Sequence, residues 1–353
     1  MKKNKKKNSR LIIALISFSL ISMVLVCPSG CSVTMASGGQ QEQSTASDEI
    51  TITGSVKTTT QMESATTTEV ISEQTSNYSY IKEQFENLIL QNESPYKLIE
   101  LFDEKYNAVG ICQIGELFDE LEMYMAESMD RYTDILFSDY EKYQIPLFNQ
   151  FDGNINIDEV KSIEDDELRN LVEEIYKSGY KLVGLEGSFY PIIDYNIFLK
   201  YTDYMLTEYK EYILIQAKES EKVSMIDGAL TITWDDAAQR LVNIESFVTS
   251  FPDSSKKEAM GNLFFRYLTS YFYGLNNTPA FDYCTNEFYP DVIESYKKTI
   301  SYYGGTVVSE LVSSYLASVE NNSFIMNDDV RNTAAGLMKQ AEQKLKIINP
   351  FNF

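Results

Sequence analysis

The chain has 353 residues, among them 30 lysines and arginines, 52 aspartates and glutamates, and no histidine, and its formal net charge is −22. An acidic chain of this kind lacks the basic face that phosphate contacts require, so we expect no nucleic-acid partner. Attachment to anionic lipid by charge alone is disfavoured for the same reason. Without histidine, the Ser-His-Asp and Cys-His catalytic arrangements and all imidazole metal sites are excluded.

The first 30 residues have the pattern of a lipoprotein-type signal peptide. Residues 1–10 are cationic, and residues 11–26 are uncharged and mostly apolar. As a helix, the apolar segment would span roughly 24 Å, less than the ~30 Å hydrocarbon core of a bilayer, so a cleaved secretory signal is favoured over a permanent anchor. Without this leader the chain carries a net charge of −28.

The end of the signal peptide resembles the lipobox of bacterial lipoproteins, in which a small residue precedes a lipidated cysteine. Residues 29–32 have the sequence Ser-Gly-Cys-Ser, so we predict that Cys31 carries the lipid, with Cys27 as the alternative. Pro28 departs from the aliphatic residue that is usual at its place. Cleavage after Ala36 would instead release a secreted protein. The prediction is a chain anchored by lipid to the outer face of the cell membrane.

Residues 31–77 consist mainly of Ser, Thr, Gln, Glu and Gly and contain no aromatic residue. This composition cannot bury enough apolar surface to offset the entropy lost on ordering, so we predict a disordered linker. From Tyr78 the composition changes to Tyr, Phe, Leu and Ile. We predict that residues 78–353 form the folded extracytoplasmic part, as one domain or two closely packed ones. A chain of that length needs no disulfide to be stable.

Apolar residues recur at spacings of three and four along most of this part, as in Leu117, Leu121 and Met125, which indicates amphipathic helices. The lack of alternation between strands and helices disfavours an α/β solute receptor. Residues 229–234 are the one good strand candidate. The sequence therefore predicts an all-α, irregular multi-helix globular domain. The predicted helices cover about residues 78–88, 117–136, 165–178, 202–220, 233–250, 256–273, 291–302, 307–319 and 328–348, and a further helix begins at about residue 95.

Several features that could signal a site have simpler structural explanations. The segment 152–159 resembles a calcium-binding loop, but no register places ligands at all the positions of an EF-hand, so we predict an acidic turn that caps a helix. Cys112 and Cys284 could be bridged outside the cytoplasm, but two buried, small apolar side chains are favoured. The many tyrosines and phenylalanines are assigned to the core. We predict no metal site and no cofactor.

Two segments, residues 190–195 and 278–283, share the pattern Pro-x-apolar-Asp-Tyr. A proline followed by an aspartate favours a turn that starts a helix, and this structural role is the simpler interpretation. If the two loops instead frame one pocket, Asp194 and Asp282 should lie within about 12 Å of each other. The residues of such a pocket would be Glu186, Asp194, Tyr195, Asn276, Asn277, Asp282 and Tyr283.

Two stretches, Leu185–Tyr195 and Arg266–Pro279, resemble segments in secreted proteins of Gram-positive bacteria that have no assigned activity. A composition rich in Lys, Asn, Ile and Tyr agrees with a low-GC bacterial source. The resemblance covers about residues 180–345 and implies a secreted, helical protein. It carries no known catalytic residue, so it implies no activity.

The sequence contains no phosphate loop, dinucleotide fingerprint or nucleophile elbow, and we predict no catalytic residue. We therefore expect a non-enzymatic module that binds an unidentified protein, peptide or cell-wall ligand. The alternative is a wall- or glycan-acting hydrolase that uses carboxylates, since these need no histidine. Acids that converge in a cleft with raised pKa values would favour the hydrolase, and acids that cap helices would favour the binding module.

Overall fold

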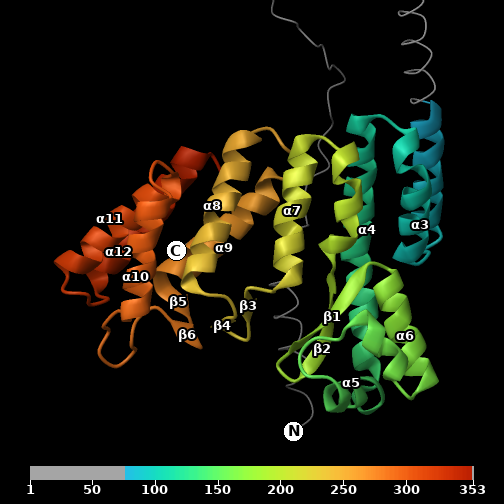
Figure 1. Ribbon diagram of the computed structural model, residues 1–353, viewed down its shortest axis with the longest axis horizontal. Coiled ribbons are helices and arrows are strands. Elements are labelled where there is room, and N and C mark those ends of the chain that lie inside the picture. Colours follow the sequence, from blue (N-terminus) through green and yellow to red (C-terminus); the bar gives the residue numbers. More distant parts are fainter. Residues whose placement is uncertain (1–75, 352–353) are drawn as a thin grey trace, which may run out of the picture.

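The computed structural model describes residues 76–351 and confirms the predicted all-α fold (Figure 1). The predicted signal peptide, the linker before residue 76, and Cys27 and Cys31 lie outside the described residues. A first helix covers residues 76–90. The other α-helices are α3 (Pro95–Lys105), α4 (Ile111–Ser138), α5 (Tyr140–Gln150), α6 (Asp166–Lys177), α7 (Thr207–Glu221), α8 (Trp234–Ser250), α9 (Lys257–Tyr273), α10 (Pro290–Tyr302), α11 (Val307–Asn321) and α12 (Asp328–Leu345).

Short elements connect these helices. The 3₁₀-helices are η1 (Tyr106–Ala108), η2 (Ile157–Ser162) and η3 (Tyr195–Tyr204). Three antiparallel hairpins pair β1 (Tyr180–Leu185) with β2 (Ser188–Ile193), β3 (Met225–Ile226) with β4 (Ala229–Leu230), and β5 (Gly274–Leu275) with β6 (Thr278–Pro279). Each hairpin is a separate two-stranded sheet, so helices carry most of the architecture.

Helix boundaries follow from local residues at the ends of the predicted ranges. Asp165 precedes α6, and its Oδ1 accepts a backbone N–H of the first turn at 2.8 Å. Thr233 precedes α8 and forms a capping box with Asp236. Gly179 follows α6 with a φ of +81°, and a Cβ there would lie 2.7 Å from the side chain of Met125. The positive φ therefore favours glycine at this position, where the end of the Met125 side chain would also have to shift to admit a Cβ.

The acidic segment 152–159 is the predicted helix cap. Asn156 Oδ1 accepts the N–H of Asp158 at 3.1 Å, and Glu159 Oε2 accepts the N–H of Asn156 at 2.9 Å. Together these residues form a capping box at the start of η2. The polar side chains of this turn thus satisfy backbone donors that the short helix leaves unpaired.

The strands were predicted poorly, for two physical reasons. The predicted strand over residues 229–234 is wrong beyond Leu230, because Thr233 caps a helix that already begins at Trp234. The β1–β2 hairpin was missed because its strands bury nearly every side chain. They therefore lack the alternation that marks a half-exposed strand. Residues 190–193 belong to β2, so the predicted loop between helices is wrong for these residues.

Both outer edges of the β1–β2 hairpin are occupied by other parts of the chain. On β2, the buried Gln144 accepts the N–H of Phe189 at 2.7 Å and donates to its carbonyl at 3.0 Å, while Pro191 has no N–H. On β1, Gly184 donates its N–H to the carbonyl of Gly153. A Cβ at Gly184 would lie 2.7 Å from that carbonyl oxygen, so the absence of a side chain permits this close approach.

Helix α7 lies between two groups of helices, with α3–α6 on one side and α8–α12 on the other (Figure 1). One continuous hydrophobic core runs through both groups, from Ile81 to Ile347. Its largest fully buried side chains are all tyrosines and phenylalanines, which confirms their assignment to the core. At Gly115, a Cβ would lie 2.4 Å from the Tyr209 ring, so α4 and α7 approach closely there. Among the described helices, none is both long and apolar enough to cross a membrane.

Candidate functional site

A groove of about 1150 Å³ runs along the surface between α7 and α8. Thr207 at the start of α7 and Phe251 after the end of α8 line one end of it. Lys222 after the end of α7 and Asp236 in the first turn of α8 line the other end. The two helices are therefore antiparallel, and the groove follows most of their length. The 15 residues of α7 give a length of roughly 22 Å.

Two kinds of surface line the groove. Helix α8 contributes exposed polar side chains spaced by three and four residues, which places them on one helix face: Gln239, Asn243, Ser246 and Ser250. Apolar surface comes from α7 and from the end of α8. Leu214 of α7 is 43% exposed. The rings of Phe247 and Phe251 lie 5.2 Å apart at one end. A ligand here would meet amides and hydroxyls on one wall and apolar groups on the other.

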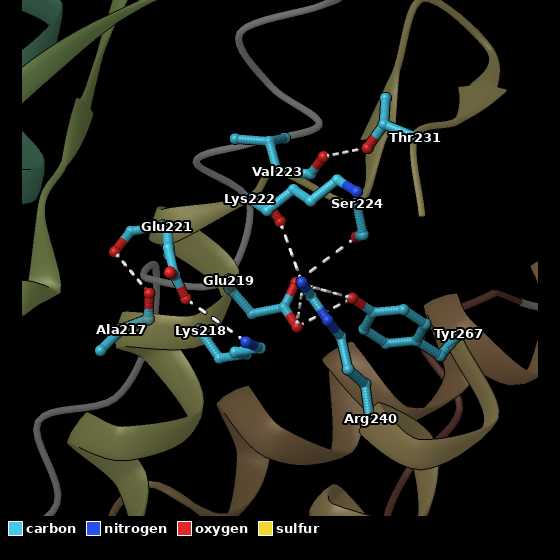
Figure 2. Close-up of polar contacts among 11 residues, drawn as sticks. Ala217, Lys218, Glu219, Glu221, Lys222, Val223, Ser224, Thr231, Arg240 and Tyr267 are labelled. Carbon is cyan, nitrogen blue, oxygen red and sulfur yellow. Dashed lines mark hydrogen bonds and ion pairs between the residues drawn. The ribbon is translucent and has the colours of Figure 1, made fainter. Parts of the chain in front are cut away.

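A buried ion pair closes the opposite end of the groove (Figure 2). Arg240 Nη1 donates to Glu219 Oε1 at 2.9 Å, and both Nη atoms of Arg240 donate to the carbonyl of Lys222 at 3.1 Å. Tyr267 of α9 donates its hydroxyl to the Glu219 carboxylate at 2.8 Å. Burial, together with the Glu219 charge, raises the pKa of Tyr267, so this hydroxyl stays protonated. The network joins α7, α8 and α9 at the floor of the groove.

A second buried ionic cluster lies outside the groove and joins α4 to the start of α9. Lys256 is 8% exposed and forms ion pairs with Glu122 at 2.6 Å and with Asp119 at 2.5 Å. Glu122 Oε1 also accepts the hydroxyls of Tyr195 at 2.5 Å and Tyr212 at 2.6 Å. Burial alone would lower the pKa of Lys256, but the two carboxylates raise it well above its usual range. The paired charges indicate a structural role.

Among residues 76–351, neither of the two carboxyl groups with a raised pKa faces an ionised partner across a cleft, as the acid of a glycoside hydrolase does. In residues 76–351, burial raises the pKa of Asp119 and Glu245. Neither lines the groove. Asp119 pairs with Lys256, and Glu245 accepts two backbone N–H groups at the start of α11, each at 2.7 Å. Within the groove, Glu219 is paired and Asp236 caps α8. Each of these four acids therefore has a structural contact.

The first segment of the predicted two-loop pocket is divided between a turn and the core. Glu186 lies in the β1–β2 turn with a φ of 49°. Asp194 Oδ1 accepts the N–H of Asn196 at 3.2 Å and so caps η3, which is the helix-start role that the sequence favoured. Tyr195 points into the core, where its hydroxyl donates to Glu122. This tyrosine is therefore part of the ionic cluster around Lys256.

The second segment is held by the β3–β4 hairpin and by its own turn. Asn277 donates its N–H to the carbonyl of Gly228 at 2.7 Å. Asn276 lies beside the same glycine, since a Cβ at Gly228 would be 3.5 Å from the Asn276 Cβ. Asp282 Oδ1 accepts two backbone N–H groups of its own turn at 2.8 Å, and these bonds hold the Asp282 pKa below its usual range. Tyr283 is 59% exposed.

Residues 190–195 and 278–283 are all described by the structure. No hydrogen bond or ion pair joins one of these segments to the other. None of the seven residues lines the groove between α7 and α8. Each instead lies in a turn, contacts another element or is exposed. A pocket shared by the two loops stays a prediction, and the groove is the candidate site.

The two cysteines of the folded part, Cys112 and Cys284, are exposed free thiols. The interpretation that they are buried apolar side chains is wrong, and they do not form a disulfide. Cys112 lies in the first turn of α4 on the face away from the buried Ile114. Cys284 belongs to the exposed turn that Asp282 stabilises, where its N–H donates to the aspartate at 2.8 Å.

Neither the groove nor the ionic clusters were predicted from the sequence. One signal was present at Glu122, which lies in the apolar stripe of α4 next to residues such as Phe118, where a charge requires a partner. Arg240 similarly lies on the buried face of α8. Gln239 and Asn243 carry no such signal, because exposed polar residues at this spacing occur on any solvated helix face.

Comparison with known proteins adds no assignment to the site. No protein-family model matches the chain, and no curated protein or solved structure matches it either. Within residues 76–351, no group of three acidic or cysteine side chains is arranged to hold a metal ion. The function is therefore inferred from the chemistry of the groove and from the sequence.

Proposed function

We propose that the protein is a lipid-anchored, extracytoplasmic binding module and that the groove between α7 and α8 binds its ligand. The observation that carries the proposal is the pairing of polar and apolar surface in one elongated groove. The side-chain amides of Gln239 and Asn243 make no hydrogen bond within the described residues, and Leu214 on the facing helix is 43% exposed. Free amides beside apolar surface are typical of a site that binds a peptide, because amides pair with a peptide backbone.

The charge and length of the groove support the same ligand class. Its lining contains four acidic and three basic residues, so it is close to neutral although the chain as a whole is strongly acidic. A groove of roughly 22 Å accommodates about six or seven residues of an extended peptide, at about 3.3 Å per residue. We therefore infer that the ligand is an extended peptide of low net charge.

A photo-cross-linking amino acid at position 239 should form an adduct with a surface peptide or protein when the full chain is expressed on intact cells. The substitution Asn243→Trp in the same chain should abolish the adduct, because the indole occupies the groove. The cross-linking residue at Asn332, on an exposed face of α12, is the matched control and should form none. Equal adduct yields at both positions, or an adduct that survives Asn243→Trp, would contradict the proposal.

The lipid anchor is tested separately by metabolic labelling with a palmitate analogue. We expect the full chain to incorporate the label and Cys31→Ala to lose it, because the lipid is attached to that thiol. Loss of label in Cys27→Ala instead would move the anchor to the alternative cysteine. A chain that incorporates no label is not a lipoprotein, and this result would leave the groove experiment unaffected.

A further inference from the structure

The face of α5 that points away from the core carries exposed apolar side chains. Ile145 is 41% exposed and Phe148 is 57% exposed, while Tyr140, at the start of the helix on the side of Tyr143 and Gln144, is 43% exposed. Ile145 and Phe148 are three residues apart, so they are neighbours on the helix surface. Phe148 also adjoins the β1–β2 turn, since a Cβ at Gly187 would lie 3.9 Å from its ring. Tyr140 donates its hydroxyl to the Gly187 carbonyl at 3.0 Å. The apolar stripe is therefore continuous with the turn.

The opposite face of α5 holds this surface firmly in place. Tyr143, Gln144 and Leu147 are buried against the rest of the fold. Gln144 makes two hydrogen bonds to Phe189 of β2, and Tyr143 donates its hydroxyl to Glu167 at 2.8 Å. The helix cannot rotate to bury Ile145 or Phe148 without breaking these contacts. The apolar face is thus a fixed feature of the surface.

The stretch of chain that contains this face is strongly negative. Residues 139–174, which form α5, η2 and most of α6, contain eleven acidic and three basic residues, a net charge of −8. Lys142 is already paired with Glu167 at 2.5 Å. By contrast, Glu141, one turn before the exposed isoleucine, and Glu186, in the adjoining turn, form no ion pair within the described residues. Figure 1 shows α5 and α6 together at one end of the molecule.

We propose that this face of α5, together with the Glu186-Gly187 turn, docks a cationic amphipathic helix of a partner protein. The apolar side of that helix covers Ile145 and Phe148, and its lysines or arginines pair with Glu141 and Glu186. Charge complementarity selects this partner, because an acidic segment would face uncompensated repulsion. An anionic bilayer would be repelled in the same way. The surface is separate from the groove between α7 and α8, so this inference does not depend on the proposed function.

The test uses the full chain and a synthetic amphipathic helical peptide made of leucine and lysine, with fluorescence anisotropy as the measurement. We expect saturable binding that weakens at least about tenfold when the salt concentration rises from ~0.05 M to ~0.5 M, because exposed charge pairs are screened. A peptide with glutamate in place of every lysine should not bind. Equal binding of the two peptides would overturn the proposal.

Substitutions separate this surface from general attraction to an acidic protein. Phe148→Ser should weaken binding of the lysine peptide about tenfold, as expected when one apolar anchor is lost. The double variant Glu141→Gln, Glu186→Gln should weaken it about fivefold and reduce its salt dependence. The matched controls Tyr302→Ser, at a ring that is 76% exposed, and Glu320→Gln should leave binding unchanged.

Binding that is unchanged in Phe148→Ser would also overturn the proposal, as would equal losses in the two control variants. Folding of each variant is checked by its thermal transition. Phe148 is more than half exposed, so its substitution should leave stability nearly unchanged. Ile145→Ser gives a second, independent test of the same surface.

Discussion

Replacing Lys256 with methionine should lower the free energy of unfolding by about 3–5 kcal/mol. The substitution removes the cation that pairs with Glu122, whose side chain is 2% exposed, and with Asp119. A buried carboxylate would then remain without a positive partner, and the interaction of the ammonium with the Tyr212 ring, 5.0 Å from the ring centre, would also be lost. Urea denaturation followed by circular dichroism measures the change.

Two further variants identify the cause of this loss. Lys177→Met removes a surface pair with Glu173, in which the lysine side chain is 59% exposed, and should change stability by less than about 0.5 kcal/mol. Combining Lys256→Met with Glu122→Gln should restore about 1 kcal/mol or more, because the unpaired charge is then absent. A loss below about 1 kcal/mol in Lys256→Met would show that the cluster is not a main support of the fold.

The free energy of unfolding should be nearly constant between about pH 6 and pH 9 and should fall steeply above about pH 10. The chain has no histidine, so few groups titrate in the neutral range. Burial raises the pKa of Tyr176 and of Tyr271 to about 12. Above about pH 10 the unfolded chain therefore releases protons that the folded chain retains, which favours unfolding by about 2 kcal/mol per tyrosine at pH 11.5.

Lys256 acts in the same direction. Its pKa is raised in the folded chain, so its contribution to stability is complete below about pH 10 and is lost as the pH rises further. Urea midpoints across this range, together with the ultraviolet absorbance of tyrosinate, measure the effect. Tyr271→Phe should make the alkaline fall less steep, whereas Tyr302→Phe, at an exposed ring, should not. A folded chain that keeps its neutral-pH stability at about pH 11.5 would contradict this prediction.

Most helices could be predicted because their signals are local. Thr233 and Asp236 lie three residues apart in sequence and form the capping box that starts α8, so the sequence pattern directly predicts the contact. The β1–β2 hairpin gave no such signal. Its strands are buried on both faces by distant parts of the chain, and a strand buried in this way loses its alternation.

The candidate site could not be predicted, because it depends on how helices lie relative to one another. Gln239 and Asn243 form a wall only because α7 stands beside α8 at the right distance. That distance is held by the ion pair of Glu219 with Arg240 and by Tyr267 from a third helix. The other ionic cluster joins Glu122 to Lys256 across 134 residues of sequence. No local pattern encodes contacts of that kind.

The closed edges of the β1–β2 hairpin also affect how the protein behaves when many copies are crowded together. An open strand edge offers its backbone N–H and C=O groups to a strand of another chain, which is the first step of cross-β aggregation. In this hairpin, Gln144 and Pro191 close one edge and Gly153 closes the other. A neighbouring molecule would have to displace these groups before it could add a strand. This sheet is therefore protected against self-association mainly by contacts within its own chain, since Lys181 of β1 is the one charged residue in its two strands.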